Sequence, residues 1–145
     1  MLGLKGKTKK VSNLNQMENL YHIRERFSII HDNKKIGIQM KWEGKREKPP
    51  MLMLPALSTI SRSDEWQSFK AIVTDKYQLI TIDWPGFGES DKKDIHYSGK
   101  VLQRTLRKAI KAIQRKNNKK LTIVAAGHSA SVVLTLKDKY INTIK

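Results

Sequence analysis

The chain has 145 residues, and its 29 Lys and Arg outnumber 13 Asp and Glu, which gives a formal net charge of +16. A chain of this length can bury one hydrophobic core, so one folded domain is expected. The absence of cysteine excludes disulfides, zinc sites with thiolate ligands and a thiol nucleophile. No apolar run approaches the ~20 residues of a membrane span, and no apolar segment follows the basic N-terminus as in a secretory signal. We therefore predict a soluble protein of the cytoplasm, or of the interior of a plastid or other organelle.

The positive charge is concentrated in three parts of the chain: the first ten residues, residues 41–48, and residues 92–120, where eleven Lys and Arg accompany one acid. A net charge of this size raises nucleic acid as a partner. No zinc-finger, RNP, KH or leucine-zipper signature accompanies it, which argues against nucleic acid. We interpret residues 92–120 as a Lys-rich, solvated helix face, and keep an anion-binding surface as the alternative.

The N-terminal part of the chain divides into a tail and a hairpin. Residues 1–20 carry Gly, Lys, Asn and Ser without a sustained period, which indicates a flexible basic tail and leaves residues 21–145 as the folded domain. Runs of β-forming residues at 24–31 and 35–42 flank Asp32-Asn33-Lys34, which is a turn signal. This pattern predicts a β-hairpin.

The rest of the chain alternates between apolar runs and amphipathic segments. Short runs rich in β-branched residues predict strands, whereas apolar side chains three and four residues apart predict helices. Pro, Gly and Asn mark the breaks between them. The first expected elements are a loop at residues 44–50, a buried central strand at 51–54, and a helix that Ser63 caps, with Trp66, Phe69, Ile72 and Val73 at helical spacing. They are followed by a strand at 77–83, a loop at 85–88, a long helix that Asn117-Asn118 ends, a strand at 121–126 and a helix at 130–140.

The long helix before Asn117 is amphipathic. One of its faces is apolar and the opposite face is basic, so the helix is expected to lie on a sheet with its cations in solvent. The apolar residues are Val101, Leu102, Leu106, Ala109, Ile110 and Ile113, and the basic residues are Lys100, Arg104, Arg107, Lys108, Lys111 and Arg115.

The resulting order of elements is β-β-β-α-β-α-β-α. Strands that alternate with helices are typical of an α/β protein with a mostly parallel sheet and helices on both faces. The N-terminal hairpin is expected to add an antiparallel edge to this sheet.

The sharpest chemical feature is Gly127-His128-Ser129-Ala130-Ser131, between a predicted strand and a predicted helix. A nucleophile elbow needs this context, because a sharp turn there projects a Ser hydroxyl above the strand ends. The tight turn demands small residues two before and two after the nucleophile, and Gly127 and Ser131 meet that demand. The amide of Ala130 would lie at a helix N-terminus, where it favours an anion.

Two further motifs follow predicted strands. One is Asp83-Trp84-Pro85-Gly86-Phe87-Gly88-Glu89-Ser90-Asp91, and the other is Leu54-Pro55-Ala56-Leu57-Ser58-Thr59. Together with the elbow, these motifs resemble the N-terminal half of the α/β-hydrolase superfamily over residues 22–145. The Leu-Pro-Ala-Leu-Ser-Thr loop resembles the cyanobacterial and plastid branch of that superfamily.

The resemblance implies an eight-stranded, mostly parallel sheet and a Ser-His-acid triad that hydrolyses small ester-type substrates without a metal or cofactor. It implies that Ser129 is the nucleophile, and that the amides of Ala130 and Leu57 form the oxyanion hole. Gly127, His128 and Ser131 would complete the elbow. Ser58 and Trp84 are candidates for the substrate pocket.

In this superfamily the acid and the His follow the nucleophile along the chain. The sequence ends at Lys145, sixteen residues after Ser129, so both are expected to be missing and the chain alone is not expected to be catalytically competent. A shortened gene product and one part of a split enzyme, completed by a second chain with the C-terminal half, stay open. The alternative is a non-catalytic basic module that engages an acidic partner, with nucleic acid as its extreme form.

Other polar residues receive simpler interpretations. Asp83 is expected to cap the turn after its strand, and Asp91 and Asp94 are expected to be solvated. His96 is the one histidine at the correct edge of the sheet to act as a base, although its main interpretation is a solvated loop residue.

The strand at 121–126 would leave an unpaired apolar edge, which predicts a marginally stable, association-prone monomer.

Overall fold

A computed structural model describes residues 20–58 and 66–136. The order of its strands and helices confirms the predicted order. The elements are β1 (Leu20–His31), β2 (Lys34–Lys45), β3 (Pro50–Leu54), α2 (Gln67–Val73), β4 (Gln78–Ile82), α3 (Gly99–Lys116), β5 (Thr122–Ala125) and α4 (His128–Leu134). The tail up to residue 19, the predicted cap Ser63 and residues 137–140 of the last predicted helix lie outside the described residues.

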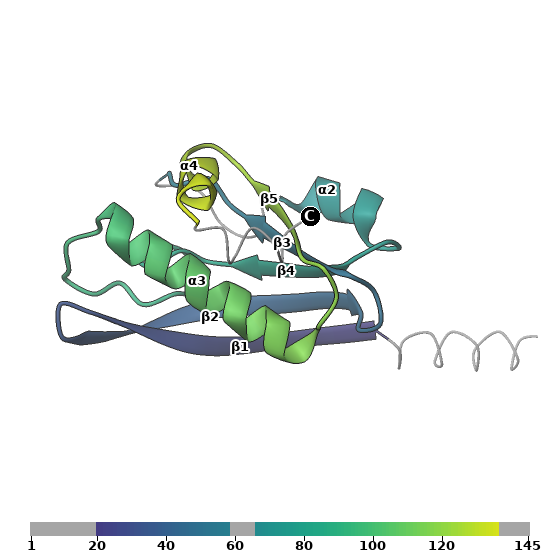
Figure 1. Cartoon of the computed structure of the whole chain (residues 1–145), viewed down its shortest axis with the longest axis horizontal. Coiled ribbons are helices and arrows are strands. Elements are labelled where there is room, and N and C mark those ends of the chain that lie inside the picture. Colours follow the sequence, from purple (N-terminus) through teal and green to yellow (C-terminus); the bar gives the residue numbers. More distant parts are fainter. Residues whose placement is uncertain (1–19, 59–65, 137–145) are drawn as a thin grey trace, which may run out of the picture.

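The five strands form one mixed sheet in the order β1-β2-β4-β3-β5 (Figure 1). The hairpin strands β1 and β2 are antiparallel to each other, and β2 is antiparallel to β4. The inner strand β3 is parallel to both β4 and β5. The predicted α/β fold with an antiparallel N-terminal hairpin is therefore confirmed. Because β3, β4 and β5 are parallel, the loops that follow them leave the sheet at the same edge.

The hairpin turn consists of Asp32 and Asn33, since Lys34 already belongs to β2. Both residues have positive φ, of 49° and 58°. A two-residue turn with positive φ at both positions matches the twist of the flanking strands, and Asp and Asn tolerate that conformation better than other side chains. The local sequence thus fixes the register of the hairpin.

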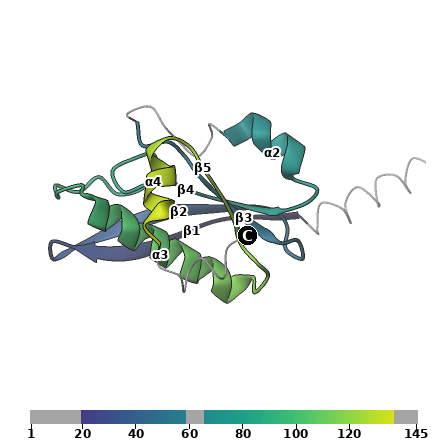
Figure 2. The ribbon, with the colours of Figure 1, turned by 45° about the horizontal axis from the view of Figure 1, so that its top comes forward.

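The two faces of the sheet are covered by different helices (Figure 2). Alternate residues of a strand point to opposite faces. Leu52, Leu54 and Ile80 belong to the main core, which α3 and α4 complete. Met51, Met53 and Leu79 form a smaller core with Trp66, Phe69 and Val73 on the side of α2.

Most of the predicted helix faces are confirmed. The buried residues of α3 are Val101, Thr105, Leu106, Ala109, Ile110 and Ile113. Ile72 lies in α2 as its helical spacing predicts, but its side chain is 75% exposed. The helix α2 has seven residues, and its Phe69 and Val73 pack against the smaller core together with Trp66, which precedes the helix. The last helix begins at His128, two residues earlier than predicted.

The long helix α3 also covers the outer edge of the hairpin. Arg104 donates a hydrogen bond to the carbonyl of Ile30, and Lys108 Nζ donates to the carbonyl of Ser28 at 2.8 Å. Both carbonyls belong to β1, an edge strand of the sheet. Charged side chains on edge carbonyls oppose pairing with another chain, so this edge is protected. At the other edge, β5 pairs with β3 and with no further strand among the described residues.

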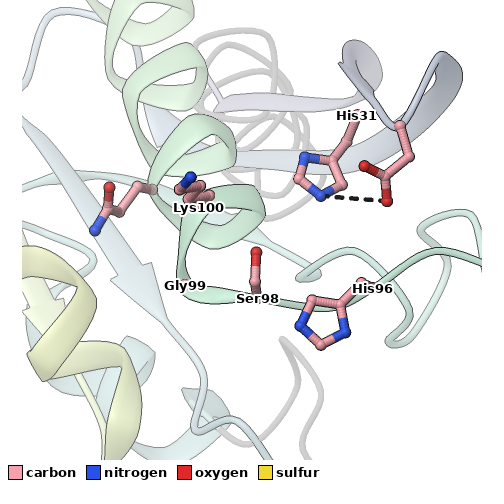
Figure 3. A pocket seen from close by; sticks show the side chains of 7 residues that line it. His31, His96, Ser98, Gly99 and Lys100 are labelled. Carbon is pink, nitrogen blue, oxygen red and sulfur yellow. Dashed lines mark ion pairs between the residues drawn. The ribbon is translucent and has the colours of Figure 1, made fainter.

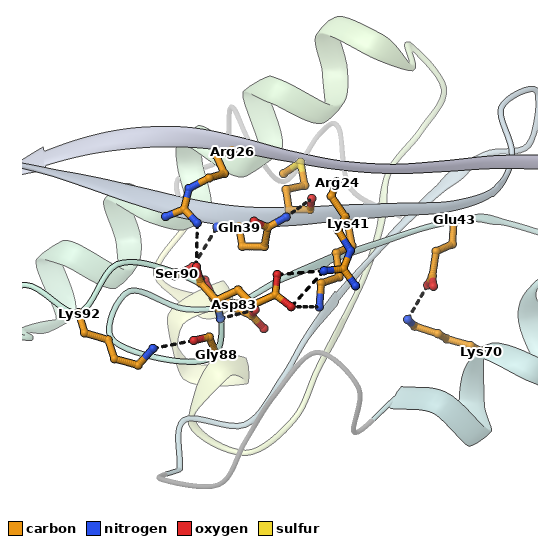
Figure 4. A network of polar contacts seen from close by, with 12 residues as sticks. Arg24, Arg26, Gln39, Lys41, Glu43, Lys70, Asp83, Gly88, Ser90 and Lys92 are labelled. Atoms are coloured by element: carbon orange, nitrogen blue, oxygen red, sulfur yellow. Dashed lines mark hydrogen bonds and ion pairs between the residues drawn. The ribbon is translucent and has the colours of Figure 1, made fainter.

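A network of polar contacts ties the loop after β4 to the hairpin (Figure 4). The carboxylate of Asp91 receives Arg26 Nη2 at 2.6 Å and the amide of Gly37 at 2.7 Å. The Asp91 amide in turn donates to the Gly37 carbonyl at 2.8 Å. The expectation that Asp91 is solvated was therefore wrong, because Arg26 and Gly37, more than fifty residues away in the sequence, supply its partners.

Asp83 and Ser90 hold the two ends of the same loop together. Asp83 Oδ2 accepts a hydrogen bond from the amide of Glu89 at 3.0 Å, and Ser90 Oγ donates to the carbonyl of Asp83 at 2.6 Å. Ser90 Oγ also accepts from the amide of Gln39 at 2.9 Å, which connects the loop to β2. The prediction that Asp83 caps its turn is confirmed. These side chains are engaged in holding the loop, which fixes the position of Trp84 within it.

Within the described residues, no helix combines the length and the apolar character that crossing a bilayer requires.

The main core can be tested with two isoleucines on different helices. Ile110 of α3 is 0% exposed, so Ile110→Ala should lower the free energy of unfolding by about 2–5 kcal/mol. The same substitution at the exposed Ile72 should change it by about 0.5 kcal/mol or less. Urea unfolding followed by circular dichroism measures both, and equal losses would contradict the assignment of the core.

Gly88 tests the loop after β4. Its φ is +51°, and a Cβ there would lie 2.4 Å from Asp83 Cγ, so Gly88→Ala should lower the free energy of unfolding by roughly 2–4 kcal/mol. Gly99, at the start of α3, is the matched control, because a Cβ there meets nothing within 4 Å. Gly99→Ala should be neutral or slightly stabilising. A Gly88→Ala variant with the stability of the parent in denaturant would contradict the described loop.

Candidate active site

Three loops meet at the edge of the sheet where β3, β4 and β5 end. They contribute Pro55 directly after β3, Trp84 two residues after β4, and Ser129 as the second residue of α4, which follows β5. The indole Nε1 of Trp84 donates to Ser129 Oγ at 2.9 Å and also to the carbonyl oxygen of Pro55 at 3.1 Å. The parallel pairing of the strands thus brings together residues that are 29 to 74 positions apart.

Ser129 is fully buried, with 0% of its surface exposed. Its hydroxyl donates a hydrogen bond to the carbonyl of Pro55 and accepts the one from Trp84. The structure differs here from the expectation that the turn projects this hydroxyl above the strand ends. In this conformation the proton and a lone pair of Oγ are both engaged inside the protein.

The sharp turn of the elbow lies at Gly127, which has φ 54° and ψ −132°. Only glycine adopts this region readily, so the predicted need for a small residue at this position has a backbone cause. A Cβ on Gly127 would lie 3.5 Å from the Cβ of Ala56, which shows how closely the loops after β3 and β5 approach. Ser129 follows within α4, and its amide donates to the carbonyl of Ala126 at 3.1 Å.

The predicted oxyanion donors lie on two of these loops. The amide of Ala130 donates to the carbonyl of Gly127 at 3.1 Å, so it takes part in the first turn of α4. Leu57 is half-buried and packs against the main core. Ser58, His128 and Ser131 are exposed. Their roles in a site stay predictions.

Trp84 is 1% exposed and belongs to the main core. The predicted interpretation as a packing residue fits this burial, and its place in a substrate pocket stays a prediction. Sequence reasoning missed its bond to Ser129. The Asp-Trp-Pro-Gly motif places a Trp at the end of a strand, but no signal in the sequence says which way its indole N–H points.

Two open cavities lie elsewhere on the surface. One, of about 510 Å³, is lined by His31, Asp32, His96, Ser98, Gly99, Lys100 and Gln103 at the start of α3 (Figure 3). The other, of about 600 Å³, is lined by Pro85, Gly86, Phe87, Lys92, Lys93, Asp94 and Tyr97. Ser129 lines neither of them, so the first cavity does not bring His96 to the hydroxyl.

The histidines of the described residues have other partners or face solvent. His31 Nε2 lies 3.6 Å from Asp32 Oδ2, and its Nδ1 lies 3.4 Å from Arg104 Nη1. His22, His96 and His128 are exposed. Over residues 20–58 and 66–136, no group of three or more His, Asp or Glu side chains is placed to hold a metal ion.

By sequence, the chain matches no protein-family model and no curated protein. By structure, it is similar to 2-hydroxy-6-oxo-6-phenylhexa-2,4-dienoate hydrolase from a Rhodococcus strain, with a TM-score of 0.68 and 15% identity over 87% of this chain and 44% of that one. A haloalkane dehalogenase from Agrobacterium tumefaciens gives a TM-score of 0.66 and 19% identity over 83% of this chain and 38% of that one. The thioesterase domain of the curacin biosynthetic pathway gives a TM-score of 0.67 and 17% identity over 85% of this chain and 42% of that one.

The chain therefore spans less than half the length of each of these three proteins. Their names describe different reactions, and fold similarity at this level of identity does not decide among them. The likeness to a cyanobacterial and plastid branch stays a prediction. The structural similarity to these proteins leads to one conclusion: over the part that it spans, the chain has the α/β-hydrolase fold.

Proposed function

We propose that the chain supplies the nucleophile side of a serine hydrolase that acts on small ester-type substrates, with Ser129 as the nucleophile. The observation that carries this proposal is the meeting of Pro55, Trp84 and Ser129 where three parallel strands end. In open α/β sheets, ligands bind at the carboxyl ends of the strands. The glycine turn at Gly127 and the helix that follows it support the same assignment.

The chemistry would proceed in two balanced steps. Ser129 Oγ forms a bond to the acyl carbon while its proton passes to a His base, and the carbonyl electron pair moves to the oxygen. The amide of Leu57 would stabilise this oxyanion, together with the amide of Ala130 once that amide leaves the carbonyl of Gly127. Its collapse expels the alcohol, which takes the proton from the His, and water then releases the acid by the same sequence.

The His and the acid would come from a further segment that adds a strand beside β5. This strand is half-buried and pairs with β3 alone among the described strands, so its outer edge is the place where such a segment can continue the sheet. A second chain that carries the C-terminal half of the fold is one source of that segment. Without a base, a Ser hydroxyl is a weak nucleophile at neutral pH.

Labelling by a fluorophosphonate tests this proposal. The chain alone should label slowly at Ser129, and the Ser129→Ala variant should lose that label. Ser68→Ala is the matched control, because Ser68 is exposed on α2, away from the elbow, and its loss should leave labelling unchanged. Mass spectrometry of the labelled peptide locates the adduct. A label that survives in Ser129→Ala would contradict the proposal.

A second candidate function rests on the outer face of α3. Lys100, Arg107, Lys111 and Arg115 have no hydrogen-bond or ion-pair partner among the described residues, whereas Arg104 and Lys108 bind β1. By helical periodicity the four lie opposite the buried residues, over about 22 Å of helix axis. No aromatic residue lies within α3, so stacking with single-stranded bases is not supported. This surface fits the phosphate backbone of a nucleic-acid duplex.

The salt dependence of duplex binding tests this second candidate. With four phosphate contacts, the logarithm of the binding constant should fall with the logarithm of the salt concentration with a slope of about −3.6, because each contact contributes roughly −0.9. The double variant Arg107→Gln/Lys111→Gln should lower that slope by about half. The matched variant Arg104→Gln/Lys108→Gln removes the same charge from the side chains bound to β1, and its slope should change less. An absence of binding at low salt, or equal effects of the two pairs, would remove this function.

A further inference from the structure

Trp84 holds the hydroxyl of Ser129 from inside the protein. The hydroxyl proton points at the carbonyl of Pro55, and the indole N–H of Trp84 points at the hydroxyl oxygen. All three groups are buried, and the two side chains are 1% and 0% exposed. The contact is therefore a closed triangle of one indole, one hydroxyl and one carbonyl.

This triangle opposes both of the events that begin acyl transfer. A backbone carbonyl accepts a hydrogen bond but cannot act as a base, so the hydroxyl proton is committed to a group that cannot remove it. The indole N–H occupies a lone pair of Oγ, the atom whose electrons must attack the acyl carbon. Burial in addition keeps substrate away from Oγ.

The residues around the triangle explain why it is stable in this position. Pro55 has no N–H and a fixed φ, which restricts the turn that presents its carbonyl. The loop that carries Trp84 is held by Asp83, Ser90 and Asp91 through the contacts described above. On the other side, the turn at Gly127 sets where Ser129 enters α4.

We propose that this arrangement is a closed state of the nucleophile, and that Trp84 is the positioning residue that maintains it. Ser129 becomes reactive when its bonds to Trp84 and Pro55 break and the hydroxyl turns outward. The inference rests on the proposed serine hydrolase function and adds its regulation: the population of the open state limits the reactivity of Ser129. Removal of the indole N–H should therefore raise that population.

The chain offers a matched control for Trp84. Trp42 is equally buried, at 1% exposure, belongs to the same core, and donates its indole N–H to Glu25 Oε1 at 2.7 Å. Trp84→Phe removes the indole hydrogen bonds to Ser129 and Pro55, and Trp42→Phe removes the one to Glu25. Both variants keep an aromatic ring. They differ in that only the first removes a bond to Ser129.

The first measurement is the rate at which a fluorophosphonate labels Ser129. Trp84→Phe should label roughly two- to tenfold faster than the parent, the range that corresponds to one net hydrogen bond. Trp42→Phe should label at the parental rate. Denaturant unfolding of both variants separates this effect from a general loss of stability, because the control carries a comparable loss without touching Ser129.

The second measurement does not depend on reactivity. In a ¹H–¹⁵N spectrum, the indole N–H resonance of Trp84 should shift, and its exchange with solvent should accelerate, in Ser129→Ala. The resonance of Trp42 should stay in place. The indole N–H of Trp66 is buried with no hydrogen-bond partner among the described residues, and its resonance gives a second reference beside that of Trp42.

The outcomes separate this inference from the function on which it rests. Labelling of the parent at Ser129 without acceleration in Trp84→Phe would overturn the closed state and leave the serine hydrolase standing. An unshifted Trp84 resonance in Ser129→Ala would overturn it as well. No labelling in any variant would overturn the proposed function, and the closed state of a nucleophile with it. Faster labelling together with the shifted resonance would support the inference.

Discussion

The parallel pairing of β3 with β4 on one side and β5 on the other is the constraint on which the rest of the structure depends. Parallel strands send their following loops to one edge of the sheet. Three segments that are distant in sequence therefore meet there, at Pro55, Trp84 and Ser129. Antiparallel pairing of the same strands would place those loops at opposite edges, and no common site would exist.

The polar side chains of the loop after β4 serve its shape. Asp83, Ser90 and Asp91 bind backbone groups of the loop itself and of β2, which joins the hairpin to the centre of the sheet. A motif rich in acids and hydroxyls is easily interpreted as catalytic. Here its polar groups are engaged in structure, and Trp84 is the member that reaches Ser129.

The positive charge of α3 divides into two groups with different physical roles. Arg104 and Lys108 donate to the backbone of β1 and cover its outer edge. Lys116 likewise binds β1, at Glu25, whereas four cations along the opposite face have no partner among the described residues: Lys100, Arg107, Lys111 and Arg115. The two edges of the sheet consequently differ, because cations protect β1 and no comparable contact is described along β5. This asymmetry favours the β5 edge for a further strand.

Local sequence was enough to predict the order of the elements, the hairpin turn at Asp32 and Asn33, the buried face of α3 and the glycine at the elbow. These features depend on periodicity and on backbone preference within a few residues, which the local sequence carries. The tertiary structure decided the exposure of Ile72, the partners of Asp91 and the direction of the Ser129 hydroxyl. Each of these depends on which side chains and carbonyls approach from segments that are distant in the sequence, and only the assembled sheet brings those groups together.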